Sequence, residues 1–138
     1  MPGETNLAGL IRHMQPTLQP GTYCFCNWPY ERTPEFSVLG SFHEAEGLSV
    51  IVAESDAIHH GLIPVLRSAW ITLNVHSDLQ VVGFLAAISR ALADAGIPSN
   101  VVSAIYHDHL FVPIELAEQA MSVLEDLLRT SGEPLDAA

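Results

Sequence analysis

Positive charge is scarce in this sequence. Five Lys and Arg residues stand against 16 Asp and Glu residues, and the formal net charge of the 138 residues is −11. Nucleic acids and anionic membrane surfaces are bound through clustered Lys and Arg side chains, which displace the counterions of the phosphates. The sequence has no such cluster, so it predicts neither a nucleic-acid partner nor a membrane partner.

Long apolar runs and cysteine pairs with metal or redox spacing are also missing. No run approaches the roughly 20 apolar residues that cross a bilayer, and residues 1–16 carry an acid before their first base and no long apolar block, unlike a secretory signal. Cys24 and Cys26 do not have the C-x-x-C spacing of a redox site. We therefore expect a soluble, cytosolic protein in which both cysteines are buried thiols.

Sequence signatures of catalysis are absent as well. There is no G-x-S-x-G, no Gly-rich phosphate loop, no H-E-x-x-H and no lone cysteine in a basic environment. Glu44 and Glu46 are close enough in the sequence to form a carboxylate pair, but nothing near them indicates a buried cleft, and we expect both on the surface. The sequence predicts a protein that is not an enzyme and that has no cofactor.

What is present is a clear order of strands and helices in the second half of the chain. Residues 69–75 alternate, with Ala69 and Ile71 on one face and Trp70 and Thr72 on the other, which predicts a strand. Residues 77–96 change to a helical period. One face of that helix then holds Val81, Phe84, Leu85, Ile88, Leu92 and Ala95.

A hairpin and a second helix follow. Residues 97–106 and 109–114 predict two strands whose turn lies near His107 and Asp108, and a two-residue turn would pair Tyr106 with His109. In that register Ile105 and Leu110 share the core face. Residues 115–129 predict a helix, and its apolar face holds Ala117, Ala120, Met121, Leu124 and Leu128.

This order is that of a ferredoxin-like α+β fold that lacks one strand. Because an open sheet edge favours aggregation, we expect the missing strand to come from the N-terminal half or from a second chain. The N-terminal half offers candidate strands at residues 21–28, 35–43 and 48–54, and candidate short helices at residues 5–14 and 55–62.

The sheet face opposite the helices is expected to be unusually apolar. It would carry Trp70, Thr72, Val102, Ala104, Tyr106 and Phe111. Such a face is too apolar for open water, so we expect the N-terminal strands, a second copy of the chain, or both to cover it. The sequence therefore predicts a homodimer with this face at or near an interface.

At this point the sequence resembles a known family. The stretch "WITLNVHSDLQVVGFLAAISRALADAGIPSNVVSAIYHDHLFVPIELAEQAMSVLEDL" is similar to an ACT domain: a strand ends in a short polar loop, a Gly comes early in the helix, "LADAGI" leads into the second strand, and a hairpin precedes a helix. The segments "GTYCFCNWP" and "FHEAEGLSVIV" extend the resemblance to small proteins with two ACT-like modules in tandem. The ACT modules of cytosolic arginine sensors and of aspartokinase are similar in the C-terminal region.

The resemblance implies a fold, a function and a site. The fold is α+β, with two ferredoxin-like (βαββαβ) halves packed together: an N-terminal module over residues 1–63, an ACT domain over residues 64–131, and a flexible tail over residues 132–138. The implied function is non-catalytic regulation by a small molecule, commonly an amino acid, bound at the strand-to-helix loop near a module or subunit junction. The matching positions here are His76, Ser77, Asp78, Leu79, Val81, Val82 and Gly83, with Asn100 and Val101 on the next strand.

Elementary chemistry is compatible with that site. The amide groups that open a helix suit a carboxylate, Asp78 or Asn100 offers an oxygen to an ammonium group, and Gly83 permits close approach of a ligand or a partner. The alternative is that Asp78 only caps the helix, Gly83 only packs, and Asn100 only opens a strand.

The histidines allow a second interpretation. His76 would end its strand at the same end of the sheet as His107 and His109, beside Asp108. Two or three imidazoles and a carboxylate could hold a zinc-like ion, contact a ligand or a partner, or simply lie in a solvated turn. A metal-binding protein or small metalloenzyme that uses His76, His107 and His109 is therefore the alternative to the amino-acid-binding regulator.

Overall fold

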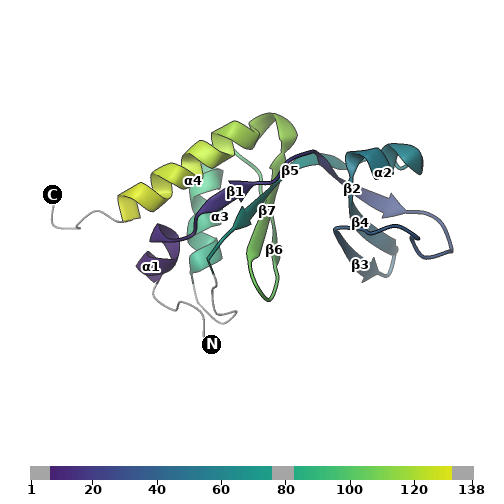
Figure 1. Cartoon of the computed structure of the whole chain (residues 1–138), viewed down its shortest axis with the longest axis horizontal. Coiled ribbons are helices and arrows are strands. Elements are labelled where there is room, and N and C mark those ends of the chain that lie inside the picture. Colours follow the sequence, from purple (N-terminus) through teal and green to yellow (C-terminus); the bar gives the residue numbers. More distant parts are fainter. Residues whose placement is uncertain (1–6, 76–82, 132–138) are drawn as a thin grey trace.

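The chain folds around one antiparallel sheet, which the computed structural model describes together with its helices over residues 7–75 and 83–131. The sheet has seven strands in the order β3-β4-β2-β5-β7-β6, and β1 also pairs with β5. The elements are α1 (Leu7–Arg12), β1 (Pro16–Leu18), β2 (Tyr23–Trp28), β3 (Gly40–Glu44), β4 (Gly47–Ala53), α2 (Glu54–His59), β5 (Leu66–Leu73), α3 (Phe84–Asp94), β6 (Asn100–Ser103), β7 (Asp108–Pro113), a 3-10 turn η1 (Ile114–Leu116) and α4 (Ala117–Ser131). Figure 1 shows their arrangement.

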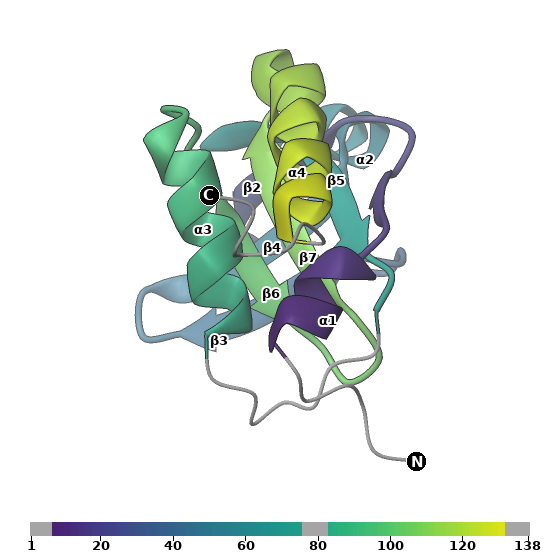
Figure 2. The same cartoon turned by 90° about the vertical axis from the view of Figure 1, so that its left-hand side faces the viewer.

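The second half confirms the predicted alternation of strands and helices. β5 pairs with β7, with Trp70 opposite Phe111 and Thr72 opposite His109, and β7 pairs with β6. α3, α4 and the short α1 gather over the same part of the molecule (Figure 2). Their apolar faces meet the inner residues of β5, because Ala69, Ile71 and Leu73 are all buried. The chain thus adopts a mixed α+β architecture, as expected.

The strand that the C-terminal half lacks comes from the N-terminal half, as the sequence predicted. β1 pairs with the end of β5, placing Pro16 opposite Leu73 and Leu18 opposite Ile71. β2 pairs with the beginning of the same strand, where Tyr23 lies opposite Ser68. One edge of β5 is therefore occupied by two N-terminal strands in succession, and the other edge by β7.

Two apolar cores lie on the helix-covered side of the sheet. The larger one combines Leu10, Ile11 and Met14 from the N-terminal segment with buried residues of β5, β7, α3 and α4. The smaller one contains Cys24, Cys26 and Trp28 of β2, with Ala57 of α2. Both cysteines are free and buried, as expected, and burial raises the pKa of each thiol, which disfavours the reactive thiolate.

The two C-terminal helices bury the faces that their periodicity predicted. Phe84, Ile88 and Leu92 of α3 are buried. In α4, Ala120 and Leu124 are fully buried, whereas Met121 and Leu128 are half-buried against the same core. Val81, which was assigned to the first of these faces, lies outside the described residues.

The predicted register of the β6–β7 hairpin was wrong. Val102, not Tyr106, lies opposite His109, and Val101, not Ile105, lies opposite Leu110. The connection spans residues 104–107, closed by a hydrogen bond from Ala104 N–H to the His107 carbonyl (3.1 Å), and Ile105 and Tyr106 are 69 % and 71 % exposed within it. A longer turn thus replaces the expected two-residue one. Asp108 is also not at the tip: it opens β7 and is buried.

Several expectations stay predictions. The boundary between residues 63 and 64 is one of them, and the tail over residues 132–138 lies outside the described residues. Within the described ranges, no helix is both long enough and apolar enough to cross a membrane.

We predict that truncating Leu10 destabilises the whole chain. Leu10 is fully buried in the core that it shares with α3 and α4, so Leu10→Ala should lower the free energy of unfolding by about 2–5 kcal/mol. Ile58→Ala is a suitable control, because Ile58 is 73 % exposed on α2, and it should change stability by no more than about 0.5 kcal/mol. Urea denaturation followed by circular dichroism measures both. Equal, small effects would mean that α1 is not part of the core.

Candidate functional site

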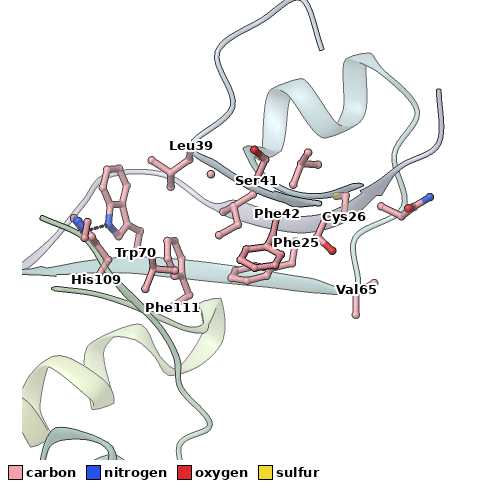
Figure 3. Close-up of a pocket in the computed structure, with 16 residues that line it drawn as sticks. Phe25, Cys26, Leu39, Ser41, Phe42, Val65, Trp70, His109 and Phe111 are labelled. Atoms are coloured by element: carbon pink, nitrogen blue, oxygen red, sulfur yellow. Dashed lines mark hydrogen bonds between the residues drawn. The ribbon is translucent and has the colours of Figure 1, made fainter. Parts of the chain in front are cut away.

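The sheet face opposite α3 and α4 contains a hollow of about 590 Å³. It receives residues from β2, β3, β4, β5, β6 and β7 and from the chain segments beside them. Its lining consists of Phe25, Cys26, Asn27, Leu39, Gly40, Ser41, Phe42, Ser49, Val50, Ile51, Val65, Trp70, Val102, Ala104, His109 and Phe111. Figure 3 shows Trp70 and His109 at one end of this hollow and Val65 and Cys26 at the other.

Strand alternation explains why these residues meet. On β2, Cys24, Cys26 and Trp28 are buried toward α2, so Phe25 and Asn27 face the other side. The registers then align Phe25 with Ile51 of β4, and Trp70 with Phe111 of β7. The N-terminal strands extend the sheet beside β5, and the apolar face predicted from the sequence becomes the floor of a hollow instead of being fully covered.

Aromatic side chains form a connected wall in the hollow. The rings of Phe25 and Phe111 meet edge to face with centroids 5.3 Å apart, and Trp70 and Phe111 are stacked at 6.4 Å with an interplanar angle of 17°. Tyr23 supports Trp70 from β2 at 5.2 Å. Because each ring is fixed by another ring, this wall is formed before any ligand arrives.

His109 is the polar group that is held in place against this wall. Trp70 Nε1 donates a hydrogen bond to His109 Nδ1 at 3.0 Å, and Thr72 Oγ1 lies 3.2 Å from the same nitrogen. An indole N–H can only donate, so Nδ1 must be the acceptor and the imidazole is neutral, with its proton on Nε2. Gln19 donates to Thr72 Oγ1 at 3.0 Å and thereby orients the hydroxyl group.

The surroundings of His109 also disfavour its protonation. Burial lowers the pKa of His109 below its ordinary value, the neighbouring His107 lowers it further, and Asp108 opposes both effects. Adding a proton to Nδ1 would replace an acceptor by a donor opposite the Trp70 N–H. The geometry and the direction of the pKa shift therefore agree on a neutral His109.

The residues implied as the amino-acid site are only partly described. His76, Ser77, Asp78, Leu79, Val81 and Val82 lie outside the described residues. Gly83 is the N-cap of α3 with φ +97°, a left-handed conformation that favours glycine, and within residues 7–75 and 83–131 no side-chain hydrogen bond caps the helix there. A methyl group at Gly83 would lie 3.5 Å from Leu7 Cδ2, so α1 packs beside this helix start.

Asn100 and Val101 lie at the opposite end of α3 from Gly83. They begin β6, where Asn100 is exposed and Val101 is half-buried opposite Leu110. α3 has 11 residues, so its two ends are separated by roughly 16 Å. One free amino acid therefore cannot contact both Gly83 and Asn100 of the same copy.

The histidine interpretation finds no support in a metal site. No group of three His, Cys, Asp or Glu residues within residues 7–75 and 83–131 could hold a metal ion. The rings of His107 and His109 are 6.5 Å apart, and His109 Nδ1 is already bonded to Trp70. His76 lies outside the described residues. In the structure, His109 accepts a hydrogen bond from Trp70 Nε1.

Another aromatic cluster lies beside α2, around Trp28. The guanidinium of Arg32 sits 5.3 Å from the Trp28 ring and 4.7 Å from the Tyr30 ring, while Trp28 Nε1 donates to the Arg32 carbonyl at 2.7 Å. His60 stacks on Phe36 at 4.5 Å. The chain's own arginine fills this cation-binding arrangement, so we assign it a structural role. Glu44 and Glu46 are exposed, as expected.

Most residues on the N-terminal side of the hollow were not predicted from the sequence. Phe25, Leu39, Phe42 and Val65 were not assigned to any site. The alternation of Tyr23 and Phe25 with Cys24 and Cys26 was a usable signal, because it places large aromatic side chains on the face opposite the buried cysteines. The register that brings β2 beside β5, however, could not be read from the sequence.

The chain is similar in sequence and structure to known proteins. Two sequence profiles of the ACT domain match the chain, one over residues 2–67 and the other over residues 65–126. A Vibrio cholerae protein described as being of unknown function and a possible transport protein is 35 % identical with a TM-score of 0.77, and the match covers 88 % of this chain and 95 % of that one. No protein with a curated description is similar enough to count as a relative.

More distant solved structures share the fold. The ligand-free regulatory subunit of aspartate kinase from Thermus thermophilus has a TM-score of 0.62 at 13 % identity, with 81 % of this chain and 95 % of that chain covered. A protein from Agrobacterium tumefaciens has a TM-score of 0.60 at 18 % identity, with 81 % and 87 % covered.

Fold and profiles together define a tandem α+β module of the kind that generally binds small molecules for regulation and is typically non-catalytic. The chain belongs to the ACT domain family.

We predict a histidine-dependent loss of stability at acidic pH. The pKa of His109 is lower in the folded chain than in the unfolded chain. Below about pH 6.5 the unfolded chain therefore binds more protons than the folded chain. As a result, the contribution of His109 does not reduce the free energy of unfolding above that pH, and that free energy falls as the pH drops below it. His109→Gln cannot titrate and should lose part of this fall. Urea denaturation between pH 8 and pH 5 measures the difference.

His43→Gln is the matched control, since His43 is exposed on β3, and it should retain the wild-type pH dependence. If His109→Gln has the same pH dependence as the wild type, His109 is not held neutral by its surroundings.

Proposed function

We propose that the chain is a non-catalytic, cytoplasmic regulatory protein that binds an amino acid at the start of α3 and works as a homodimer. The proposal rests on the backbone conformation at the beginning of α3. Gly83 adopts the left-handed conformation there and itself has no side chain that could cap the helix, and the first backbone N–H groups of a helix suit a ligand carboxylate. Membership of a family that generally binds small molecules supports the same conclusion.

The ammonium group of the ligand needs a hydrogen-bond acceptor, and the proposed acceptors are the side-chain oxygens of Asp78 and Asn100. Asn100 is exposed beyond the opposite end of α3 from Gly83, and the helix between them is roughly 16 Å long. A junction between two copies is therefore proposed, in which Asp78, Val81, Val82 and Gly83 of one copy face Asn100 and Val101 of the other.

The sheet offers an edge for that junction. β6 ends the strand order of the sheet, and Asn100 and Val101 are its first residues. An exposed edge strand can pair with the edge of another copy. β6 is short, which limits uncontrolled aggregation through this edge when it is unpaired. A ligand that binds only across the paired arrangement would stabilise the dimer, which is a population shift and a sufficient basis for regulation.

A thermal-shift screen across the 20 amino acids tests the ligand. One amino acid, or a small chemically related group, should raise the melting temperature, because a ligand present at 100 times its Kd stabilises the folded state by about 2.7 kcal/mol, or of the order of 10 °C here. Asp78→Ala and Asn100→Ala should each abolish the shift. Glu125→Ala, which removes an exposed carboxylate of α4, should not. An unchanged melting temperature with every amino acid would contradict the proposal.

Mixing two inactive variants tests the junction. If each site takes Asp78 from one copy and Asn100 from the other, a dimer formed from one Asp78→Ala chain and one Asn100→Ala chain has one intact site. Random mixing makes half of the dimers mixed, so about one quarter of the wild-type binding capacity should return. Calorimetry with the active amino acid measures it. No recovery in a sample whose mixed dimers are verified by mass spectrometry would place both residues in one copy's site.

A further inference from the structure

We propose that the hollow on the sheet is a second ligand site, which takes an uncharged, planar, apolar small molecule that carries one hydrogen-bond acceptor, such as an aromatic carbonyl compound with two or three fused rings. The hollow is separate from the proposed amino-acid site, because neither Gly83 nor Asn100 lines it. The proposal stands independently of the amino-acid site.

The size and shape of the hollow suit a small molecule. Its volume of about 590 Å³ falls in the range of roughly 300–1,000 Å³ that is usual for ligand sites. A second copy related by two-fold symmetry would bring the same surface patch opposite this one, and only side chains that protrude from that patch could enter the hollow.

The charge of the lining sets the charge of the ligand. The sequence has 16 acidic and five basic residues, yet no Asp, Glu, Lys or Arg lines the hollow. A charged ligand would lose its hydration there without gaining a counter-charge, which is costly. The lining therefore selects an uncharged guest.

The aromatic rings set the ligand's shape. Trp70 and Phe111 are stacked, and Phe25 meets Phe111 edge to face. Phe42 of β3 and Val65 remain 72 % and 86 % exposed at the margin of the hollow. Burying these exposed surfaces against a flat aromatic molecule contributes most of the expected affinity.

His109 sets the ligand's one polar contact. Nδ1 is used by Trp70, so the neutral ring carries its proton on Nε2. The hydrogen bonds of His109 to the described residues Trp70 and Thr72 are both made by Nδ1. An N–H group on a residue that lines the end of an apolar hollow suits a hydrogen-bond acceptor such as a carbonyl oxygen.

The first test uses the neutral, planar dye Nile red, which contains a carbonyl group and fluoresces in apolar surroundings. The wild-type chain should bind it saturably with a stoichiometry of one per chain. Phe42→Asp introduces a charge at the margin and should weaken binding about ten-fold or more. Ile58→Asp is the matched control, since Ile58 has a similar exposure of 73 % but does not line the hollow, and it should bind as the wild type does.

The second test isolates the hydrogen bond of His109. 2-Acetylnaphthalene and 2-ethylnaphthalene have nearly the same size, but only the first has a carbonyl group. The wild type should prefer the ketone by about three- to ten-fold. His109→Phe should remove that preference and leave the affinity for 2-ethylnaphthalene within about a factor of two. Circular dichroism verifies that this variant folds.

Three results would overturn the proposal. One is the absence of saturable binding of Nile red by the wild type. Another is wild-type affinity in the Phe42→Asp variant. The last is a sedimentation experiment in which Phe42→Asp alone converts a dimer to a monomer, because the occupant of the hollow would then be a second copy of the chain.

Discussion

The pairing of β5 on both of its edges is the constraint on which the rest of the structure depends. β1 and β2 occupy one edge in succession, and β7 occupies the other. Because these N-terminal strands hydrogen-bond to a C-terminal strand, the two ACT-like halves share one sheet instead of meeting as separate bodies. Asn74, just beyond β5, donates a hydrogen bond to the Gln15 carbonyl at 2.9 Å, which ties the turn before β1 to the same strand. Both cores, the hollow and the start of α3 are positioned by that shared strand.

The two faces of β5 then have different chemical roles. Ala69, Ile71 and Leu73 are buried under α3 and α4, which is how a half-covered antiparallel sheet builds its core. Trp70 and Thr72 point the other way and fix His109 through its Nδ1. A sheet face that carries an aromatic wall and one neutral imidazole has no ionised side chain in its lining. It is chemically distinct from the start of α3, where the amino-acid site is proposed.

Much of this architecture could be predicted from periodicity. The change from period 2 in residues 69–75 to period 3.6 in the following helix identified β5 and α3, and the missing strand was expected either from the N-terminal half or from a second chain. The hairpin register could not be predicted, because a turn over residues 104–107 and a two-residue turn are equally compatible with the local sequence. The hollow was also missed, since it depends on which non-consecutive strands become neighbours, and long-range pairing of this kind leaves no local signal. The proposed amino-acid site came from family resemblance, and six of its nine residues lie outside the described ranges.

We propose that the amino-acid site is built from two copies of the chain, since Gly83 and Asn100 lie at opposite ends of α3. This can be tested by measuring the affinity for the active amino acid as a function of protein concentration, by fluorescence or calorimetry, above and below the dimer dissociation constant. The apparent affinity should fall as dilution separates the copies, and added ligand should shift sedimentation toward the dimer. An affinity that stays constant down to fully monomeric protein would contradict this proposal.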